Sequence, residues 1–224
     1  MLRSPQNLGI IHFIGIGGIG MSGIAEILHQ SGYHVQGSDI SQSKNTERLT
    51  KLGIKIFLNQ KKSNITNTKI VVVSTAISES NEELKAAKKL HIPIVHRSEM
   101  LGELMRLKQS IAIAGTHGKT TTTSLIAKMI EENGMDPTII NGGIISSLDS
   151  NARLGKGEWM VVEADESDGS FAKLNPTAAV ITNIDLEHLD YHKTEENLLS
   201  AFQNFILSIP FYGFACLCID HPRV

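Results

Sequence analysis

A glycine-rich segment that contains a lysine and several threonines, Gly115 to Thr121, has the residue types needed to hold a nucleoside triphosphate. It follows an expected strand and opens an expected helix, so backbone amides and the helix N-terminus would face the phosphates. Lys119 would neutralise charge on the β- and γ-phosphates, and the Thr120 hydroxyl would reach Mg²⁺. The first glycine of the usual longer pattern is missing, because Ile113 stands there. We therefore predict a phosphate loop of a shorter type that binds ATP.

A second glycine-rich segment, Gly15 to Gly20, fits the pattern GxGxxG between an expected strand and an expected helix. Glycines there permit a tight turn and let backbone amides approach a pyrophosphate. Asp39 ends the next expected strand, where an acid commonly binds a ribose hydroxyl. This arrangement predicts a nucleotide pyrophosphate site. The residues leave open whether the nucleotide is NAD or a nucleotide-sugar diphosphate.

Acidic residues follow two further expected strands, 159–164 and 178–182. Those after the first strand are Glu163, Asp165, Glu166 and Asp168, and those after the second are Asp185, Glu187 and Asp190, with His188 among them. The carboxyl ends of parallel strands meet at one edge of a sheet, so these side chains are expected beside the triphosphate. There they could hold Mg²⁺ or orient the transferring phosphoryl group. A solvated acidic turn is the simpler interpretation of Glu166 and Asp168, but not of Glu163, which belongs to the strand end.

The elements that must position these residues alternate as short apolar runs and helical patterns. The first series has strands near 10–14, 35–37, 54–58, 70–73 and 93–95 and helices near 21–30, 48–49, 81–90 and 101–105. The second series has strands near 110–114, 159–164, 178–182 and 213–219 and helices near 120–132 and 195–207. Such βαβ series make parallel sheets. We therefore predict an α/β protein: a Rossmann-like parallel-sheet domain over 1–108, then a P-loop ATPase domain over 109–224 that is incomplete, because it ends on a strand.

Composition narrows the class of protein. The chain has 224 residues with 21 Lys and Arg against 23 Asp and Glu, a balance that lacks the basic footprint of a nucleic-acid-binding protein. No apolar run is long enough for a membrane span, and no signal peptide opens the chain. The cysteines, Cys216 and Cys218, fit two core thiols in a reducing cytosol better than a redox or zinc motif. We expect a cytoplasmic protein with no nucleic-acid, membrane or obligate protein partner.

Together these motifs resemble the Mur ligase family. The resemblance is carried by Gly15-Ile16-Gly17-Gly18-Ile19-Gly20-Met21-Ser22-Gly23, by Gly115-Thr116-His117-Gly118-Lys119-Thr120-Thr121, by Glu163-Ala164-Asp165-Glu166-Ser167-Asp168, and by Asn183-Ile184 with Glu187-His188-Leu189-Asp190. Within the family, residues 19–22 favour the member that joins L-alanine to UDP-N-acetylmuramate over the ligase that recycles murein tripeptide. The family's architecture implies three domains, of which this chain would hold the first and part of the second, without the C-terminal amino-acid-binding domain.

The resemblance also implies a chemistry and a set of residues. ATP phosphorylates the carboxylate of UDP-N-acetylmuramate, and the amine of L-alanine then attacks the acyl phosphate, with Mg²⁺ as cofactor. The UDP part would bind at Gly15, Gly17, Gly18, Gly20 and Ser22. Asp39 is added to this set because of its place at the strand end, and not because of the resemblance. ATP would bind at Gly115, Thr116, His117, Gly118, Lys119, Thr120 and Thr121, with Asn183 nearby. The implied catalytic residues are Lys119, Glu163 and His188, and the implied metal ligands are Thr120, Glu163 and His188.

Two other classes of function compete with this interpretation. An NAD-dependent oxidoreductase would use Gly15, Gly17, Gly20 and Asp39 but would leave the loop around Lys119 without a role. A non-enzymatic binding fragment would keep the nucleotide sites without turnover. For the chain alone, the implied absence of the third domain leads us to expect binding of the UDP-sugar, no amide formation, and marginal stability or self-association.

Overall fold

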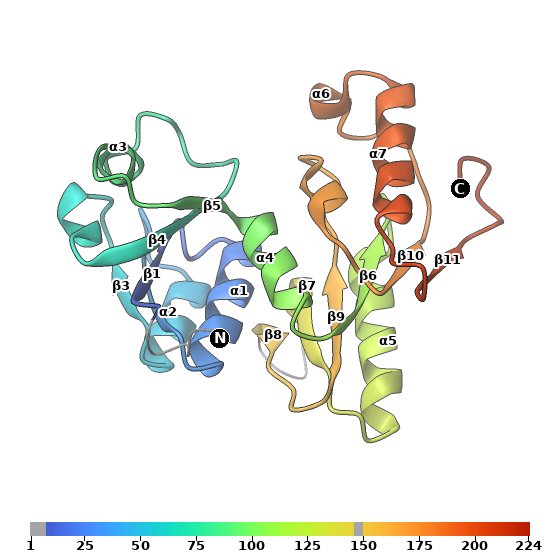
Figure 1. Cartoon of the computed structure of the whole chain (residues 1–224), viewed down its shortest axis with the longest axis horizontal. Helices are drawn as coiled ribbons and strands as arrows, with labels where there is room; N and C mark the ends of the chain where they lie inside the picture. The colour runs from blue at the N-terminus through green and yellow to red at the C-terminus, as the bar shows by residue number, and fades with distance from the viewer. Residues whose placement is uncertain (1–7, 146–149) are drawn as a thin grey trace. The chain divides into compact units, whose positions relative to one another are not determined.

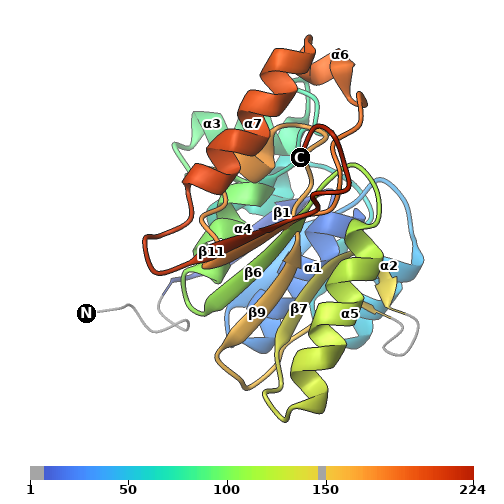
Figure 2. The same cartoon turned by 90° about the vertical axis from the view of Figure 1, so that its right-hand side faces the viewer.

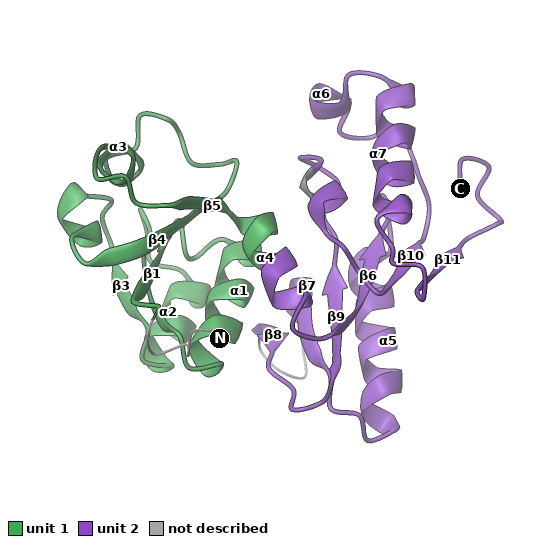
Figure 3. Cartoon of the chain, viewed as in Figure 1, with its two compact units in different colours: residues 1–100 green, residues 101–224 purple. Residues whose placement is uncertain are grey.

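The computed structural model describes residues 8–145 and 150–224. The chain divides into two compact units, residues 1–100 and 101–224, which Figure 3 shows in two colours. Each unit contains a sheet of mainly parallel strands with helices packed against it (Figure 1). The predicted α/β class with parallel sheets is confirmed.

The first unit has five parallel strands in the order β3-β2-β1-β4-β5. The strands are β1 (Ile10–Ile14), β2 (His34–Ser38), β3 (Lys55–Phe57), β4 (Thr68–Val73) and β5 (Ile94–His96). The helices are α1 (Ile19–Gln30), α2 (Lys44–Lys51), the 3₁₀ turn η2 (Lys62–Ile65), α3 (Glu82–Lys89) and α4 (Arg97–Met105), which leads into the second unit. The strand order reverses at β1, and ligands of such sheets bind beyond the carboxyl ends of the strands at that point.

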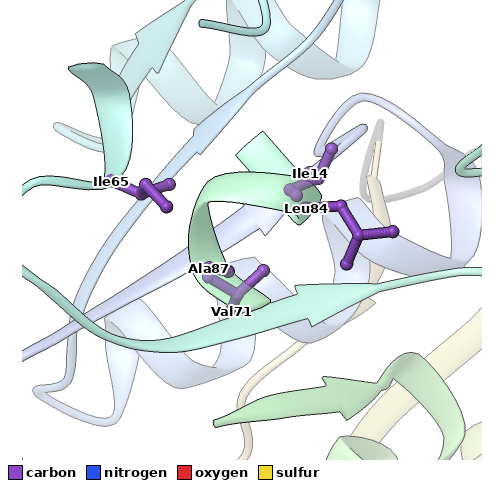
Figure 4. Packing of buried hydrophobic residues seen from close by; sticks show 5 residues of the cluster. All are labelled: Ile14, Ile65, Val71, Leu84 and Ala87. Atoms are coloured by element: carbon purple, nitrogen blue, oxygen red, sulfur yellow. The ribbon is translucent and has the colours of Figure 1, made fainter. Parts of the chain in front are cut away.

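Helix α3 is fixed to this sheet by apolar packing. Figure 4 shows the cluster, which consists of Ile14, Ile65, Val71, Leu84 and Ala87. None of these side chains is more than 4% exposed, so α3 and η2 are held firmly against β1 and β4. The start of α3 is therefore placed beside the carboxyl ends of these strands.

The second unit has six strands in the order β11-β10-β6-β9-β7-β8. The strands are β6 (Gln109–Ala114), β7 (Thr138–Ile145), β8 (Ser150–Arg153), β9 (Trp159–Glu163), β10 (Ala178–Ile181) and β11 (Phe214–Leu217). All pairs are parallel except β7 with β8, which is antiparallel. The helices are α5 (Lys119–Glu132), the 3₁₀ turn η3 (Ser170–Lys173), α6 (Leu189–His192) and α7 (Glu195–Leu207). Figure 2 shows α5 lying along β6, β9 and β7.

Strand β11 forms one edge of the second sheet, and all four of its residues are exposed. The expectation of core cysteines is wrong for Cys216, which is exposed because it lies on this edge strand. Cys218 follows the strand and is partly buried. Over the described residues, no helix has both the length and the apolar character that crossing a membrane requires.

An aromatic cluster ties α7 to the 3₁₀ turn η3. The ring of Phe171 in η3 lies 5.0 Å from that of Phe202 and 5.2 Å from that of Phe205, and all three side chains are almost fully buried. The segment between β9 and η3 carries the acidic residues predicted to lie near the triphosphate. The cluster therefore anchors one end of that segment.

Replacing Phe202 by alanine removes a buried ring from this cluster. We expect Phe202→Ala to lower the free energy of unfolding by about 3 to 5 kcal/mol, since it leaves a cavity as well as losing apolar burial. Phe211→Ala is the matched control, because that ring is fully exposed, and it should change stability by less than about 0.5 kcal/mol. Urea denaturation of both variants measures this, and equal effects would show that the cluster does not anchor α7.

Candidate functional site

The phosphate loop of the second unit lies between the end of β6 and the start of α5. Gly115 has φ +133° and Gly118 has φ +79°, backbone conformations that favour glycine. A Cβ atom on Gly115 would also collide with the hydroxyl of Thr182. The loop can therefore keep its shape only with glycine at these positions.

Asn183, two residues after the end of β10, holds this loop through its side-chain amide. His117 N donates to Asn183 Oδ1 at 2.8 Å, and Asn183 Nδ2 donates to His117 O at 3.0 Å. Thr182 Oγ1 donates to the same His117 carbonyl at 2.7 Å, and Thr116 N donates to Asn183 O at 3.0 Å. The side chain that the sequence placed near ATP is thus hydrogen-bonded to the loop backbone.

Lys119 folds back over its own loop. Its Nζ donates to Gly115 O at 2.6 Å, to Thr116 O at 3.1 Å and to Glu166 Oε1 at 2.9 Å. An ammonium group has three N–H donors, so all of them are engaged in this arrangement. A bound phosphate would have to replace at least one of these acceptors to be contacted by Lys119.

Glu166 is a buried residue, so the expectation of a solvated turn is wrong for it. It is 1% exposed, and burial raises the pKa of its carboxyl group despite the opposing effect of the Lys119 ammonium. His188 Nε2 lies 3.8 Å from Glu166 Oε1, and His192 Nε2 donates to Glu166 O at 2.9 Å. Among the described residues, Glu166 Oε2 has no hydrogen-bond partner. Glu166 therefore connects the phosphate loop with His188 and α6.

Glu163 and Thr120 lie together at the mouth of the loop. Thr120 Oγ1 donates to Glu163 Oε2 at 2.8 Å, and Gly142 N donates to the same oxygen at 2.9 Å. A Cβ atom on Gly142 would overlap the Glu163 carboxylate, so glycine permits this close approach of β7. A hydroxyl and a carboxylate are oxygen ligands of the kind that Mg²⁺ prefers. These two predicted ligands fit a magnesium ion.

The third predicted metal ligand, His188, contacts Glu166 rather than Glu163 in the interactions that the structure records. Its φ of +56° is left-handed, an uncommon conformation for a residue other than glycine. Across 8–145 and 150–224, no group of three or more His, Cys, Asp and Glu side chains is arranged to hold a metal ion. The structure thus brings together Thr120 and Glu163 and leaves the contribution of His188 as a prediction.

His117 faces two exposed carboxylates at the rim of the same loop. Its Nε2 lies 3.5 Å from Asp185 Oδ2 and 3.6 Å from Glu187 Oε1. Asp185 also lies 3.4 Å from His221 Nε2, on the segment after β11. Asp185 and Glu187 therefore lie around the His117 side chain, whereas the acidic partner of Lys119 is Glu166.

The glycine loop of the first unit joins β1 to α1 and is held by the end of β2. Gly15 N and Ile16 N both donate to Ser38 O, at 2.8 and 3.0 Å. Gly17 N donates to Asp39 Oδ2 at 2.8 Å, and Asn45 Nδ2 donates to Gly17 O at 2.8 Å. A Cβ atom on Gly17 would lie 2.8 Å from Asp39 Oδ2, closer than real Cβ contacts, so a side chain does not fit there.

Asp39 uses both carboxylate oxygens within its own unit. Oδ2 accepts from Gly17 N, and Oδ1 accepts from Ile40 N at 2.8 Å. Asp39 also lines a cavity of about 500 Å³ together with Gly15, Gly18, Gln60, Ser78 and Asn81. The predicted contact of Asp39 with a ribose stays a prediction, while its contact with the loop is directly visible.

Two further residues stand close to the start of α1. Ser22, predicted to contact the diphosphate, is fully buried, and its hydroxyl donates to Ile19 O at 3.1 Å. The guanidinium of Arg97, at the start of α4, approaches this helix: a Cβ on Gly20 would lie 3.0 Å from Arg97 Nη1. A cation therefore lies beside the glycine loop, which the motif alone did not indicate.

Comparison with known proteins gives two family matches that together span most of the chain. Residues 10–109 match the Mur ligase family catalytic domain, and residues 113–224 match the Mur ligase middle domain. The chain belongs to the Mur ligase family. The membership predicted from the two loops and the acidic segments is confirmed.

Two curated relatives with high sequence identity to this chain have the same name. The chain is 57% identical over 223 residues to the UDP-N-acetylmuramate–L-alanine ligase of Brucella anthropi and 58% identical over 224 residues to that of Rhodospirillum rubrum. These matches cover 100% of this chain but 48% and 47% of the relatives. The chain thus spans about half the length of the curated relatives it matches.

Solved structures of Mur ligases have the same fold. The UDP-N-acetylmuramate–alanine ligase of Thermotoga maritima superposes with a TM-score of 0.88 at 31% identity, over 96% of this chain and 50% of that one. A UDP-N-acetylmuramate:L-alanyl-γ-D-glutamyl-meso-diaminopimelate ligase from Neisseria meningitides gives a TM-score of 0.89 at 25% identity, over 96% and 73% of the two chains.

The pairing of Lys119 with Glu166 makes a test of this site possible. Lys119→Met leaves a buried carboxylate without its cationic partner, and we expect it to lower the free energy of unfolding by about 3 kcal/mol. Burial raises the pKa of Glu166 in the folded protein, so this loss should shrink as the pH falls and the carboxyl group takes up a proton.

The double variant Lys119→Met/Glu166→Gln is the control, because it removes the unpaired charge. It should regain at least half of the lost stability in urea denaturation at neutral pH. If the double variant is as unstable as Lys119→Met, the unpaired charge of Glu166 is not the cause of the lost stability.

Proposed function

We propose that this chain carries the UDP-N-acetylmuramate and ATP sites of a ligase that joins L-alanine to UDP-N-acetylmuramate. The observation that carries the proposal is the presence of two phosphate loops, each at the carboxyl ends of parallel strands and each followed by a helix. The names of the relatives that are 57% and 58% identical support the same activity. Since the chain spans about half of their length, the complete activity is proposed for the whole protein.

In the second unit, the residues fit magnesium and the triphosphate. Bound Mg²⁺ would act as a Lewis acid that screens the negative charge of the phosphates. Thr120 and Glu163 supply oxygen ligands for it, and Lys119 supplies a positive charge that can turn from Glu166 to the γ-phosphate. Backbone amides at the start of α5 complete the phosphate cradle.

In the first unit, the cavity bordered by the glycine loop takes the uridine diphosphate part of the substrate. The start of α1 offers backbone amides, and Arg97 adds a positive charge beside Gly20. Asp39 and Asn45 fix the conformation of the loop at Gly17: Asp39 accepts from the Gly17 amide, and Asn45 donates to the Gly17 carbonyl. These residues bind and orient the substrate, and the chemistry takes place elsewhere on it.

The proposed reaction proceeds in two transfers. A carboxylate oxygen of UDP-N-acetylmuramate attacks the γ-phosphorus of ATP, and ADP leaves. The amine of L-alanine then attacks the acyl carbon, phosphate leaves, and the amine loses a proton. The first transfer brings two anionic reactants together, so positive charge preorganised at Lys119 contributes where repulsion is strongest. This activity belongs to cytoplasmic peptidoglycan synthesis.

The alternatives have less support. An NAD-dependent oxidoreductase gives no role to Lys119, Thr120 or Glu163, which the structure gathers at one loop. For a ligase that recycles murein tripeptide, the support is the Neisseria ligase that acts on a tripeptide, which shares the fold at 25% identity, below the 31% of the Thermotoga alanine ligase. Alanine-adding relatives at 57% and 58% identity favour L-alanine as the amino acid.

Isothermal titration with two variants tests whether the two sites are separate. Gly17→Val places a side chain against Asp39, so it should weaken UDP-N-acetylmuramate binding about tenfold or more and leave Mg²⁺-ATP binding unchanged. Thr120→Val keeps the shape but removes a hydroxyl ligand, so it should weaken Mg²⁺-ATP binding about tenfold and leave UDP-N-acetylmuramate binding unchanged.

Each variant is the control for the other. General misfolding would weaken the binding of both ligands, so a variant that loses only one ligand is still folded. A wild-type chain that binds neither ligand would contradict the proposed function. Tight binding of NADH to the first unit, lost in Gly17→Val, would instead support the oxidoreductase.

A further inference from the structure

A buried polar network lies under the glycine loop of the first unit. It contains His12 from β1, Gln36 and Ser38 from β2, Asn64 from η2 and Glu83 from the first turn of α3. Glu83, His12 and Ser38 are 0% exposed, and Asn64 and Gln36 are also buried. The Mur ligase motifs include none of these residues, and the proposed function leaves them without a role.

Glu83 is the centre of this network. Its Oε2 accepts from Ser38 Oγ at 2.5 Å, and its Oε1 accepts from Asn64 Nδ2 at 2.6 Å. His12 Nε2 lies 3.4 Å from Oε2, a separation longer than an ordinary hydrogen bond, so this contact is mainly electrostatic. The carboxylate thus meets groups from β1, β2 and η2 at once.

The contacts of Gln36 define the orientation of the His12 ring. Gln36 Nε2 donates to Asn64 O at 2.8 Å and lies 3.1 Å from His12 Nδ1. Because the amide nitrogen is a donor, Nδ1 accepts, and in the neutral ring the proton stands on Nε2, which faces Glu83. The Glu83 carboxylate thus accepts two hydrogen bonds, from Ser38 and Asn64, and His12 Nε2, which has no hydrogen-bond partner among the described residues, lies 3.4 Å from it.

The network reaches the cavity through the backbone. Ser38, whose hydroxyl donates to Glu83, offers its carbonyl to the amides of Gly15 and Ile16 in the glycine loop. Glu83 N donates to Asn81 Oδ1 at 2.9 Å, and Asn81 Nδ2 donates to Gln60 Oε1 at 2.8 Å.

Three segments that line the cavity of about 500 Å³ are joined in this way: the glycine loop, the segment at Gln60 and the segment that ends at Asn81. Glu83 is linked to all three through Ser38 and Asn81 but does not itself line the cavity. A carboxylate is costly to bury, and an apolar side chain would stabilise a core as well or better. Its directional hydrogen bonds, however, fix the relative positions of the groups that donate to it.

We propose that Glu83 is a positioning residue of the first nucleotide site. It does not touch the ligand: it holds β2, η2 and the start of α3 so that the glycine loop presents its amides to a nucleoside diphosphate. This inference rests on the proposed function, since it assigns a diphosphate to the same cavity.

Titration calorimetry of the chain with UDP tests the inference. Glu83→Gln keeps the size of the side chain, but its new NH₂ group would face the Ser38 hydroxyl or the Asn64 amide, both of which already donate a hydrogen bond. We expect the dissociation constant for UDP to rise about tenfold or more, with Mg²⁺-ATP binding unchanged. Ser38→Ala removes only the hydroxyl and keeps the carbonyl that holds the loop, and it should weaken UDP binding several-fold.

Two control variants lie in the same unit. Glu82→Gln makes the same charge change at an exposed neighbour of Glu83, and Leu28→Ala removes a side chain that is 3% exposed from the last turn of α1, outside the network and the cavity lining. Both should bind UDP as the wild type does, although Leu28→Ala lowers the melting temperature. That separates a positioning role from general loss of stability.

Wild-type affinity for UDP in Glu83→Gln and Ser38→Ala would overturn the inference while leaving the proposed function intact. So would a loss of affinity in Leu28→Ala equal to that in Glu83→Gln. If Glu83→Gln does not fold, the comparison of Ser38→Ala with Leu28→Ala decides the question. Failure of the wild-type chain to bind UDP at all would overturn the proposed function, and this inference with it.

Discussion

Both phosphate loops keep their shape through hydrogen bonds from their backbone to the end of a neighbouring strand. In the first unit, Ser38 O at the end of β2 accepts the amides of Gly15 and Ile16. In the second, the Asn183 amide after β10 holds both the N–H and the carbonyl of His117. Glycine-rich loops have few side chains to pack, so this backbone anchoring keeps their amides oriented for phosphate. The remaining features of each site depend on it.

Each loop also has a carboxylate as an internal partner. Asp39 accepts from Gly17 N in the first unit, and Glu166 accepts from Lys119 Nζ in the second. These acids satisfy donors that would otherwise be left without a protein partner. The near balance of charge, 21 basic against 23 acidic residues, agrees with phosphate sites that rely on amides and helix N-termini more than on an excess of cations.

The sequence was sufficient to predict the α/β class, both glycine loops and the family, because these depend on local patterns. Most predicted helices and strands form, and Thr120 and Glu163 meet as the motifs imply. The predicted roles of Asn183 and His188 depend on ligands, and their contacts here are with His117 and Glu166.

Tertiary contacts explain what the sequence did not reveal. Burial of Glu166 depends on its contacts with Lys119 of the loop and with His192 of α6, which no local pattern encodes. Strand β7 was missed because Asn141-Gly142-Gly143 weakens its pattern, and Gly142 is there to admit the Glu163 carboxylate. The network around Glu83 joins residues from four elements far apart in the chain.

Hydrogen exchange of the chain, followed by mass spectrometry with one ligand at a time, tests the central claim of two separate nucleotide sites most directly. UDP-N-acetylmuramate should slow exchange in the peptides that contain Gly15 to Gly20 and leave those with Gly115 to Thr121 unchanged. Mg²⁺-ATP should do the reverse. Protection of the same loop by both ligands, or of neither loop by either ligand, would contradict the account.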